Sequence, residues 1–161
     1  IASTVYWLVK SIAQVPLSLY VDKKRNKLSI LLIGTFIIVL TPLFYAFSPN
    51  VEFIFIAQGI YGLGAAMAVP SWLCLFTMHV DKKHRGLEWG LWSTGIGLGV
   101  SLTAYLGAII ANNYGFKTLF FLVSAFSFVG LVILFFLSNK YIKDVERVGG
   151  IFGIKNHYHP R

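Results

Sequence analysis

Lys10 and Gln14 are the residues of this 161-residue chain whose types and positions point most directly to binding chemistry. Lys10 lies inside a long apolar stretch, and in a helix it would sit about 18 Å before Asp22, where that stretch ends. Gln14 follows one helical turn later on the same face. In a membrane, a charge at that depth costs at least ~2.5 to 3.5 kcal/mol and is a functional hypothesis by default. We expect Lys10 either to bind an anionic group, to pair with an acidic residue elsewhere in the protein, or to face a polar interior without touching substrate.

Other chemical groups are sparse, and they argue against an enzyme. His79, His84 and Glu88 superficially resemble metal ligands, but their spacing lies partly in a loop where lysines would repel a cation. The sequence has no phosphate-binding loop, nucleophile elbow or zincin motif. An intramembrane enzyme would need paired catalytic groups at one depth, and only Lys10 and Gln14 are available. We therefore expect no catalytic residues, no metal and no cofactor.

The composition is that of a membrane protein. Hydrophobic residues make up 57% of the chain and charged residues 12%, against roughly 25% charge in soluble domains. The net charge of +8 could indicate nucleic acid as a partner, but the basic residues are gathered in short loops between apolar runs. That distribution is typical of a polytopic membrane protein that follows the positive-inside rule.

Five apolar segments are long enough to cross the ~30 Å hydrocarbon core as helices. The sequence therefore predicts an all-α, polytopic membrane protein. We expect the tail, residues 138–161, to be a solvated and partly disordered cytoplasmic extension, with a helix on the lipid surface as the alternative. His157 and His159 are too few and too close to the end of the chain to predict a metal site. The five predicted spans cover residues 1–21, 28–47, 53–78, 87–111 and 118–137.

Basic residues alternate sharply between the connections. Twelve of the fourteen Lys and Arg residues follow the first, third or fifth segment, whereas Lys117 alone follows the second or fourth. This asymmetry places the basic loops and the tail in the cytoplasm, so the first segment runs inwards through what is expected to be the plasma membrane. Because the chain begins at Ile1, already in apolar sequence, we expect it to be a piece of a larger protein.

Small residues recur at helical spacing in the third and fourth segments. Gly95, Gly99 and Gly107 are spaced by four or eight residues, and Gly62 is followed by Ala66. Lipid provides no hydrophobic drive between helices, so close approach of small residues is a main source of packing. We expect these four glycines to pack helices together, or alternatively to let a backbone bend during function.

Aromatic residues could line a cavity or form membrane-interface belts: Trp7, Tyr61, Trp72, Trp92 and Tyr105.

The first basic loop resembles the loop signature of the major facilitator superfamily, Gly-x-x-x-Asp-Arg/Lys-x-Gly-Arg/Lys-Arg/Lys. Asp22, Lys23 and Lys27 match it, whereas Ser18 and Arg25 replace its glycines. Further similarity to the family covers about residues 1–137, and its other matching stretches are Gln58-Gly59, Gly62 to Ala66, Arg85-Gly86 and Gly115-Phe116.

The resemblance implies secondary active transport of a small solute by alternating access, with five of the six helices of one half of a twelve-helix transporter present here. The five predicted helices could correspond to helices two to six or to helices eight to twelve of that fold. The degenerate loop signature favours the second placement, in the second half of the transporter. The implied partners are a small-molecule solute, a coupling ion, the lipid bilayer and the missing half of the transporter, with no nucleic acid. Asp22, Lys23, Lys27 and Arg85 would form a gating loop on the cytoplasmic side. Gln58 joins Lys10 and Gln14 as a candidate substrate-binding residue.

Two departures from the family pattern leave the transport mode open. Phe55 stands where the family usually carries an Arg before Gln58, and Val100 replaces the proline of the antiporter signature. The alternative function is a membrane scaffold or assembly subunit without transport activity.

Overall fold

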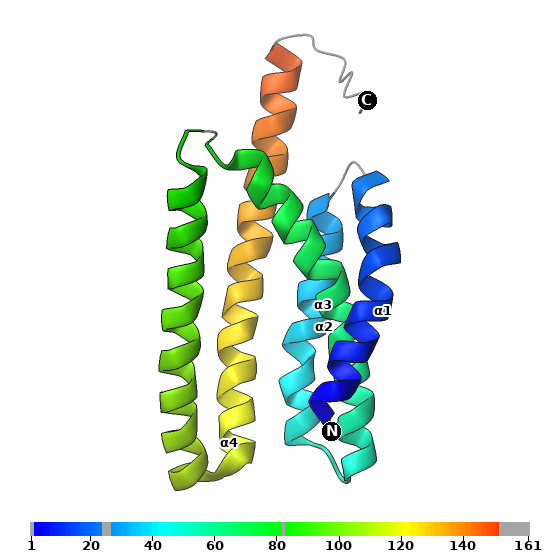
Figure 1. Ribbon diagram of the computed structural model, residues 1–161, viewed down its shortest axis with the longest axis vertical. Coiled ribbons are helices and arrows are strands. Elements are labelled where there is room, and N and C mark those ends of the chain that lie inside the picture. The colour runs from blue at the N-terminus through cyan, green and yellow to red at the C-terminus, as the bar shows by residue number, and fades with distance from the viewer. Residues whose placement is uncertain (1, 24–26, 82, 152–161) are drawn as a thin grey trace.

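A computed structural model describes residues 2–23, 27–81 and 83–151, and the side chains to residue 139. The described residues form four helices, with no strand among them (Figure 1). This confirms the all-α prediction. The helices are α1 (Ala2–Lys23), α2 (Lys27–Ala46), α3 (Val51–His79) and α4 (Arg85–Ile151).

Helix α4 contains both the fourth and the fifth predicted segments. Its backbone breaks at Gly115, where φ is 82° and ψ is 161°. The two legs of α4, residues 85–114 and 116–151, lie side by side after this break (Figure 1). The second leg continues as helix to Ile151, so the described part of the expected tail is helical, while His157 and His159 lie outside the described residues.

Side chains next to the end of α1 and the start of α3 satisfy backbone groups of these helices. The Asn50 side chain accepts a hydrogen bond at 3.0 Å from the Phe53 N–H, which caps the start of α3. At the end of α1, the Lys27 Nζ donates to the carbonyl oxygens of Val21 and Asp22, at 3.2 and 3.4 Å. These carbonyls would otherwise lack partners, since the last turn of a helix leaves its C=O groups free.

Helix α3 packs against both α1 and α2, whereas α1 and α2 scarcely meet each other. The closest approach is between α2 and α3, where a methyl group added at Gly34 would lie 2.7 Å from the backbone oxygen of Gly64. A methyl group added at Gly62 would lie 2.8 Å from the Tyr6 backbone oxygen on α1. Glycine at these positions therefore lets two neighbours approach α3 backbone to backbone.

The second leg of α4 packs on α2 and completes the bundle. The buried Ser124 hydroxyl donates to the Val39 carbonyl oxygen at 3.4 Å. The rings of Tyr45 and Phe120 lie 5.3 Å apart, and those of Phe47 and Phe121 lie 5.5 Å apart. These contacts fix the fifth predicted segment beside the second.

Three described stretches are long and apolar enough to cross a membrane: α2, α3 and residues Arg85–Asn139 of α4. Helix α1 is not among them. The reason lies in its composition, because Lys10, Gln14 and three serines interrupt its apolar residues. The crossing of the membrane by residues 1–21 stays a prediction.

The connections sort into two ends of the bundle. The end of α1, the start of α2, the end of α3 and the start of α4 lie at one end, and the α2–α3 connection and the break inside α4 lie at the other (Figure 1). Lys23, Lys27, Lys83 and Arg85 therefore belong to the same end, as the alternating pattern of basic loops predicts.

Replacing Gly115 by alanine should destabilise the fold, because a positive φ is costly for any residue with a Cβ atom. We expect Gly115→Ala to lower the free energy of unfolding by about 1 to 3 kcal/mol, measured by denaturant titration of the full-length protein in mixed micelles. Gly130→Ala is the matched control, since a methyl group there meets nothing within 4 Å. Equal stability of the two variants would contradict the strained turn.

Candidate functional site

Lys10 is half-buried on α1 and lies against aromatic rings of its own helix. Its Nζ is 4.6 Å from the centroid of the Trp7 ring and 5.7 Å from that of Tyr6. Helical side chains lean towards the N-terminus, which brings Lys10 back over the residues three and four positions earlier. The ring faces attract a cation through their quadrupole, but they provide no counter-charge.

The Lys10 region is also where α1 meets α3. The Tyr6 ring stacks on that of Tyr61 from α3, with centroids 4.7 Å apart. A methyl group added at Gly62 would lie 3.2 Å from the Lys10 backbone nitrogen. Lys10, Trp7, Tyr6 and Tyr61 are hereafter called the lysine–aromatic cluster.

Gln14 and Gln58, the other candidate substrate-binding residues, are half-buried on α1 and α3. Gln58 lies one helical turn before Gly62, so it lies on the side of α3 that carries the α1 contact. Among the described residues, no hydrogen bond joins the side chains of Lys10, Gln14 and Gln58. The structure places Lys10 and Gln14 one helical turn apart on α1 and Gln58 on the side of α3 that faces α1, without linking them directly. Their binding role stays a prediction.

The expected gating residues lie at the basic end of the bundle. Asp22 and Lys23 are exposed in the last turn of α1, and Arg85 is exposed at the first residue of α4. Lys27 is half-buried and caps α1, as described above. No ion pair joins Asp22 to any of these three basic residues in the part of the chain that the structure describes. The gating role of these four residues stays a prediction, and Lys27 has a structural role in addition.

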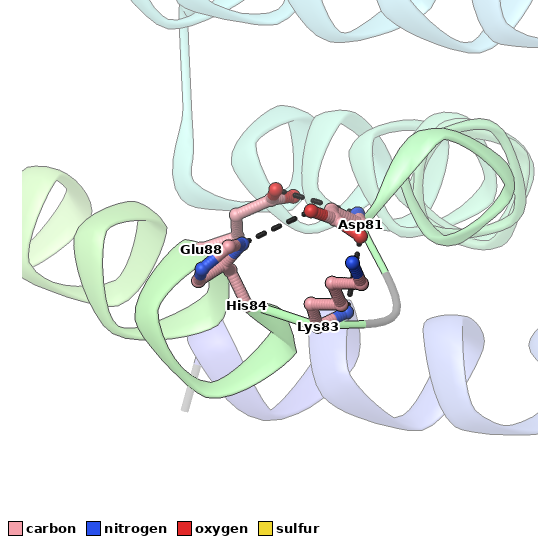
Figure 2. Close-up of polar contacts among 4 residues, drawn as sticks. All are labelled: Asp81, Lys83, His84 and Glu88. Atoms are coloured by element: carbon pink, nitrogen blue, oxygen red, sulfur yellow. Dashed lines mark hydrogen bonds and ion pairs between the residues drawn. The ribbon is translucent and has the colours of Figure 1, made fainter.

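A hydrogen-bonded network at the same end joins Asp81, Lys83, His84 and Glu88 (Figure 2). The Asp81 carboxylate accepts from the Lys83 backbone N–H at 3.0 Å and contacts the His84 Nδ1 at 3.0 Å. The Glu88 Oε1 accepts from the Asp81 backbone N–H at 3.3 Å. This network shapes the α3–α4 connection and brings Asp81 close to the start of α4, where negative charge is favourable.

The same hydrogen bonds change the acidity of Asp81. Donation from the Lys83 backbone N–H, and after it the contact with His84, hold the pKa of Asp81 below its ordinary value of 3.8. A depressed pKa means that the network adds stability at higher pH and loses it as the pH falls through the native pKa. Because the carboxylate is exposed, the stabilisation is small.

An aromatic cluster joins α3 to the first leg of α4 near this network. Trp72 stacks on Phe76 with ring centroids 4.7 Å apart, and Trp92 lies 5.2 Å from Trp72. Trp89 meets Phe76 edge to face at 4.9 Å. Trp72 and Trp92 therefore pack against each other at this junction.

The glycines of the fourth predicted segment differ from Gly62 in their surroundings. Gly95 and Gly99 face nothing within 4 Å of an added methyl group, and Gly107 faces only the Leu119 side chain, at 3.8 Å. Gly62 lies at a tight helix contact with α1, whereas packing at Gly95 and Gly99 stays a prediction.

Comparison with known proteins identifies the family. The sequence model described as Major Facilitator Superfamily matches residues 1–154. The chain belongs to the major facilitator superfamily. It is 26% identical over 155 residues to an uncharacterized MFS-type transporter of Methanocaldococcus jannaschii, a match that covers 92% of this chain and 40% of that protein.

Other relatives are named for drug resistance. The multi-drug resistance efflux pump PmrA of Streptococcus pneumoniae is 31% identical over 88 residues, 55% of this chain and 22% of its own length. The multidrug resistance protein MdtG of Proteus mirabilis is 28% identical over 123 residues, 74% of this chain and 30% of its own. No solved structure matches the chain.

Superfamily membership, together with the apolar helices, establishes a polytopic integral membrane protein. The resemblance read from the first basic loop is thereby confirmed. The chain spans 22% to 40% of the length of these three relatives.

Sequence reasoning missed three features of this site region. Gly34 opposes Gly64 across the α2–α3 contact, Lys27 caps α1, and Asp81 organises the α3–α4 connection. The residue types of the Asp81 network carried a signal, since an Asp commonly accepts from the backbone two residues later. Gly34 gave no such signal in the sequence, because a single glycine indicates a close helix contact only when the neighbouring helix is known.

The acid titration of Asp81 should be detectable by NMR in the full-length protein. We expect the Lys83 backbone amide shift to titrate with a midpoint below 3.8, because its N–H donates to the Asp81 carboxylate. Asp81→Asn should abolish that step. A midpoint at the ordinary Asp value would show that the hydrogen bonds of Figure 2 do not hold in solution.

The α1–α3 contact can be tested with two alanine variants of α3. We expect Gly62→Ala to lower the free energy of unfolding by about 1 to 3 kcal/mol, because the added methyl meets backbone atoms of α1. Gly59→Ala is the matched control one turn earlier, where the nearest atom, the Val9 Cγ2, is 4.0 Å away. Denaturant titration in micelles measures both, and equal effects would argue against the close approach.

Proposed function

We propose that the protein containing this chain is a secondary active transporter that moves a small solute across the plasma membrane by alternating access. The observation that carries the proposal is the superfamily match over residues 1–154, in a chain whose described residues form a bundle of long apolar helices. The names of PmrA and MdtG support export of small organic compounds as the direction to test first.

In this proposal the chain supplies one part of a longer transporter. Helices α1, α2 and α3 and the two legs of α4 would be helices two to six or eight to twelve of a fold built from two repeats. The 40% coverage of the archaeal relative supports this division. The missing half would then lie across the substrate route from these helices.

The fourth segment has a surface suited to that missing half. Gly95 and Gly99 are exposed and meet no other part of the described chain. Small residues allow close approach of a neighbouring helix in lipid. A helix of the other half could therefore pack on the first leg of α4 as closely as α1 packs on α3.

The basic end of the bundle is proposed to face the cytoplasm. Lys23, Lys27, Lys83 and Arg85 lie at that end among the described residues, and excess Lys and Arg in short loops marks the cytoplasmic side. Asp22 lies beside them, exposed and without an ion-pair partner in the described chain. Its carboxylate is thus available to contact the other half in one of the two transport states.

Neutralising Asp22 should slow transport without preventing membrane insertion. We expect Asp22→Asn in the full-length protein to lower the initial rate of ethidium efflux from proteoliposomes energised with a proton gradient by about threefold or more. Glu52→Gln, an exposed acid in the first turn of α3 at the opposite end, is the control and should keep the rate.

The transport experiment has two informative failures. Unchanged efflux in Asp22→Asn would remove the gating role and leave transport standing. Absence of gradient-driven movement for ethidium and for a panel of uncharged and anionic solutes would contradict the transport proposal itself.

A further inference from the structure

Helix α1 has three distinct sides, and one of them is polar. Tyr6, Val9 and Ala13 lie on the side that packs against α3. A second side carries exposed Leu8, Ile12, Val15 and Leu19, which suit contact with lipid. The third side, called the polar stripe, consists of Ser3, Trp7, Lys10, Gln14 and Ser18. These residues follow one another at intervals of three or four, which places them on one face of a helix.

The polar stripe is only partly covered by the rest of the described chain. Ser3 and Trp7 are exposed, and Lys10, Gln14 and Ser18 are half-buried. Hydrocarbon would leave this stripe poorly solvated, since polar and charged groups in membrane helices face a bundle interior or a water-filled cavity. The exposed apolar side of α1 is available for lipid, and a hydrated route would suit the polar stripe.

Lys10 is the only basic residue of the stripe, and no carboxylate of the described chain reaches it. The described acidic side chains lie in loops or at helix ends, with Asp22 about 18 Å away along α1. Its neighbours are the rings of Trp7 and Tyr6. The charge therefore has aromatic packing on one side and no negative partner.

We propose that Lys10 and Trp7 form a binding position for an aromatic organic anion, with its carboxylate paired to the Lys10 ammonium and its ring packed on the indole. The proposal rests on the transport function above and names the class of solute that this one position prefers, whereas the cation ethidium in the transport assay reports gradient-driven movement independently of this position. Trp7 is 58% exposed, which leaves much of the indole free for a ligand ring. Charge complementarity selects an anion over a cation of the same size, and the stacked rings of Tyr6 and Tyr61 pack this part of α1 against α3.

Three naphthalene probes of one shape test the charge preference without any mutation. Isothermal titration of the full-length protein in phosphatidylcholine nanodiscs is made with naphthoate, naphthylmethanol and naphthylmethylammonium. We expect naphthoate to bind about tenfold or more tightly than the alcohol, and the ammonium compound to bind most weakly. Equal affinity for the three probes, or the reverse order, would overturn the proposal.

Variants then assign the preference to Lys10. Lys10→Gln should lower the affinity for naphthoate to that for the alcohol, and binding of the alcohol that persists in this variant reports correct folding. Lys10→Arg should keep the preference. Lys117→Gln is the matched control, because Lys117 also lies over a ring, that of Phe47 at 5.7 Å, outside the polar stripe. A preference that survives Lys10→Gln, or that disappears in Lys117→Gln, would contradict the assignment.

Two further experiments distinguish a wrong binding site from a wrong transport function. If phosphatidylglycerol nanodiscs abolish naphthoate binding, a lipid headgroup occupies Lys10 and the proposal for a solute is wrong. Proteoliposome transport of ethidium with no naphthoate binding would overturn this proposal and leave the transport function intact. Naphthoate binding that depends on Lys10, without gradient-driven transport of any solute in the panel, would support the site and contradict the function.

Discussion

The close approach of helices to α3 is the constraint on which the bundle depends. Gly62 admits the backbone of α1, and Gly64 opposite Gly34 admits the backbone of α2, at distances that a single methyl group would prevent. In lipid, where burying apolar surface gains little, such van der Waals contact is a main source of association. Because α1 and α2 scarcely touch each other, α3 sets where both of them lie. The position of the lysine–aromatic cluster follows from the same contact, since Gly62 lies against the Lys10 backbone.

Much of the fold could be predicted from the sequence, because apolar runs of membrane length admit few structures. Lipid leaves a backbone no partner except its own helix, so each run becomes a helix. The predicted segments 28–47 and 53–78 lie within two residues of α2 and α3. The continuation of α4 to Ile151 could not be predicted from an apolar run, because the apolar run ends at Leu137 and the helix continues beyond it.

The candidate site was predictable only where it depends on neighbours along one helix. Lys10 is conspicuous in the sequence, and its ring partners lie three and four residues earlier. The Tyr61 stack, the Gly34–Gly64 contact and the Ser124 hydrogen bond each join different helices. Such contacts depend on which helices are adjacent and on their register. The hydropathy of the sequence predicts neither the adjacency nor the register. Methyl groups added at Gly95 and Gly99 would meet nothing within 4 Å, so the packing role of these two glycines stays a prediction.

Accessibility of single cysteines in cells tests the central claim most directly, namely that α1, α2, α3 and both legs of α4 cross the membrane with the basic end inside. The background is the full-length protein with Cys74→Ser, and the labelled variants are Ser3→Cys, Ser48→Cys, Asn113→Cys, Lys83→Cys and Asn139→Cys. The account predicts that an impermeant maleimide labels the first three in intact cells and the last two only after permeabilisation. Labelling of Ser48→Cys and Asn113→Cys from opposite sides, or of Ser3→Cys only after permeabilisation, would contradict it.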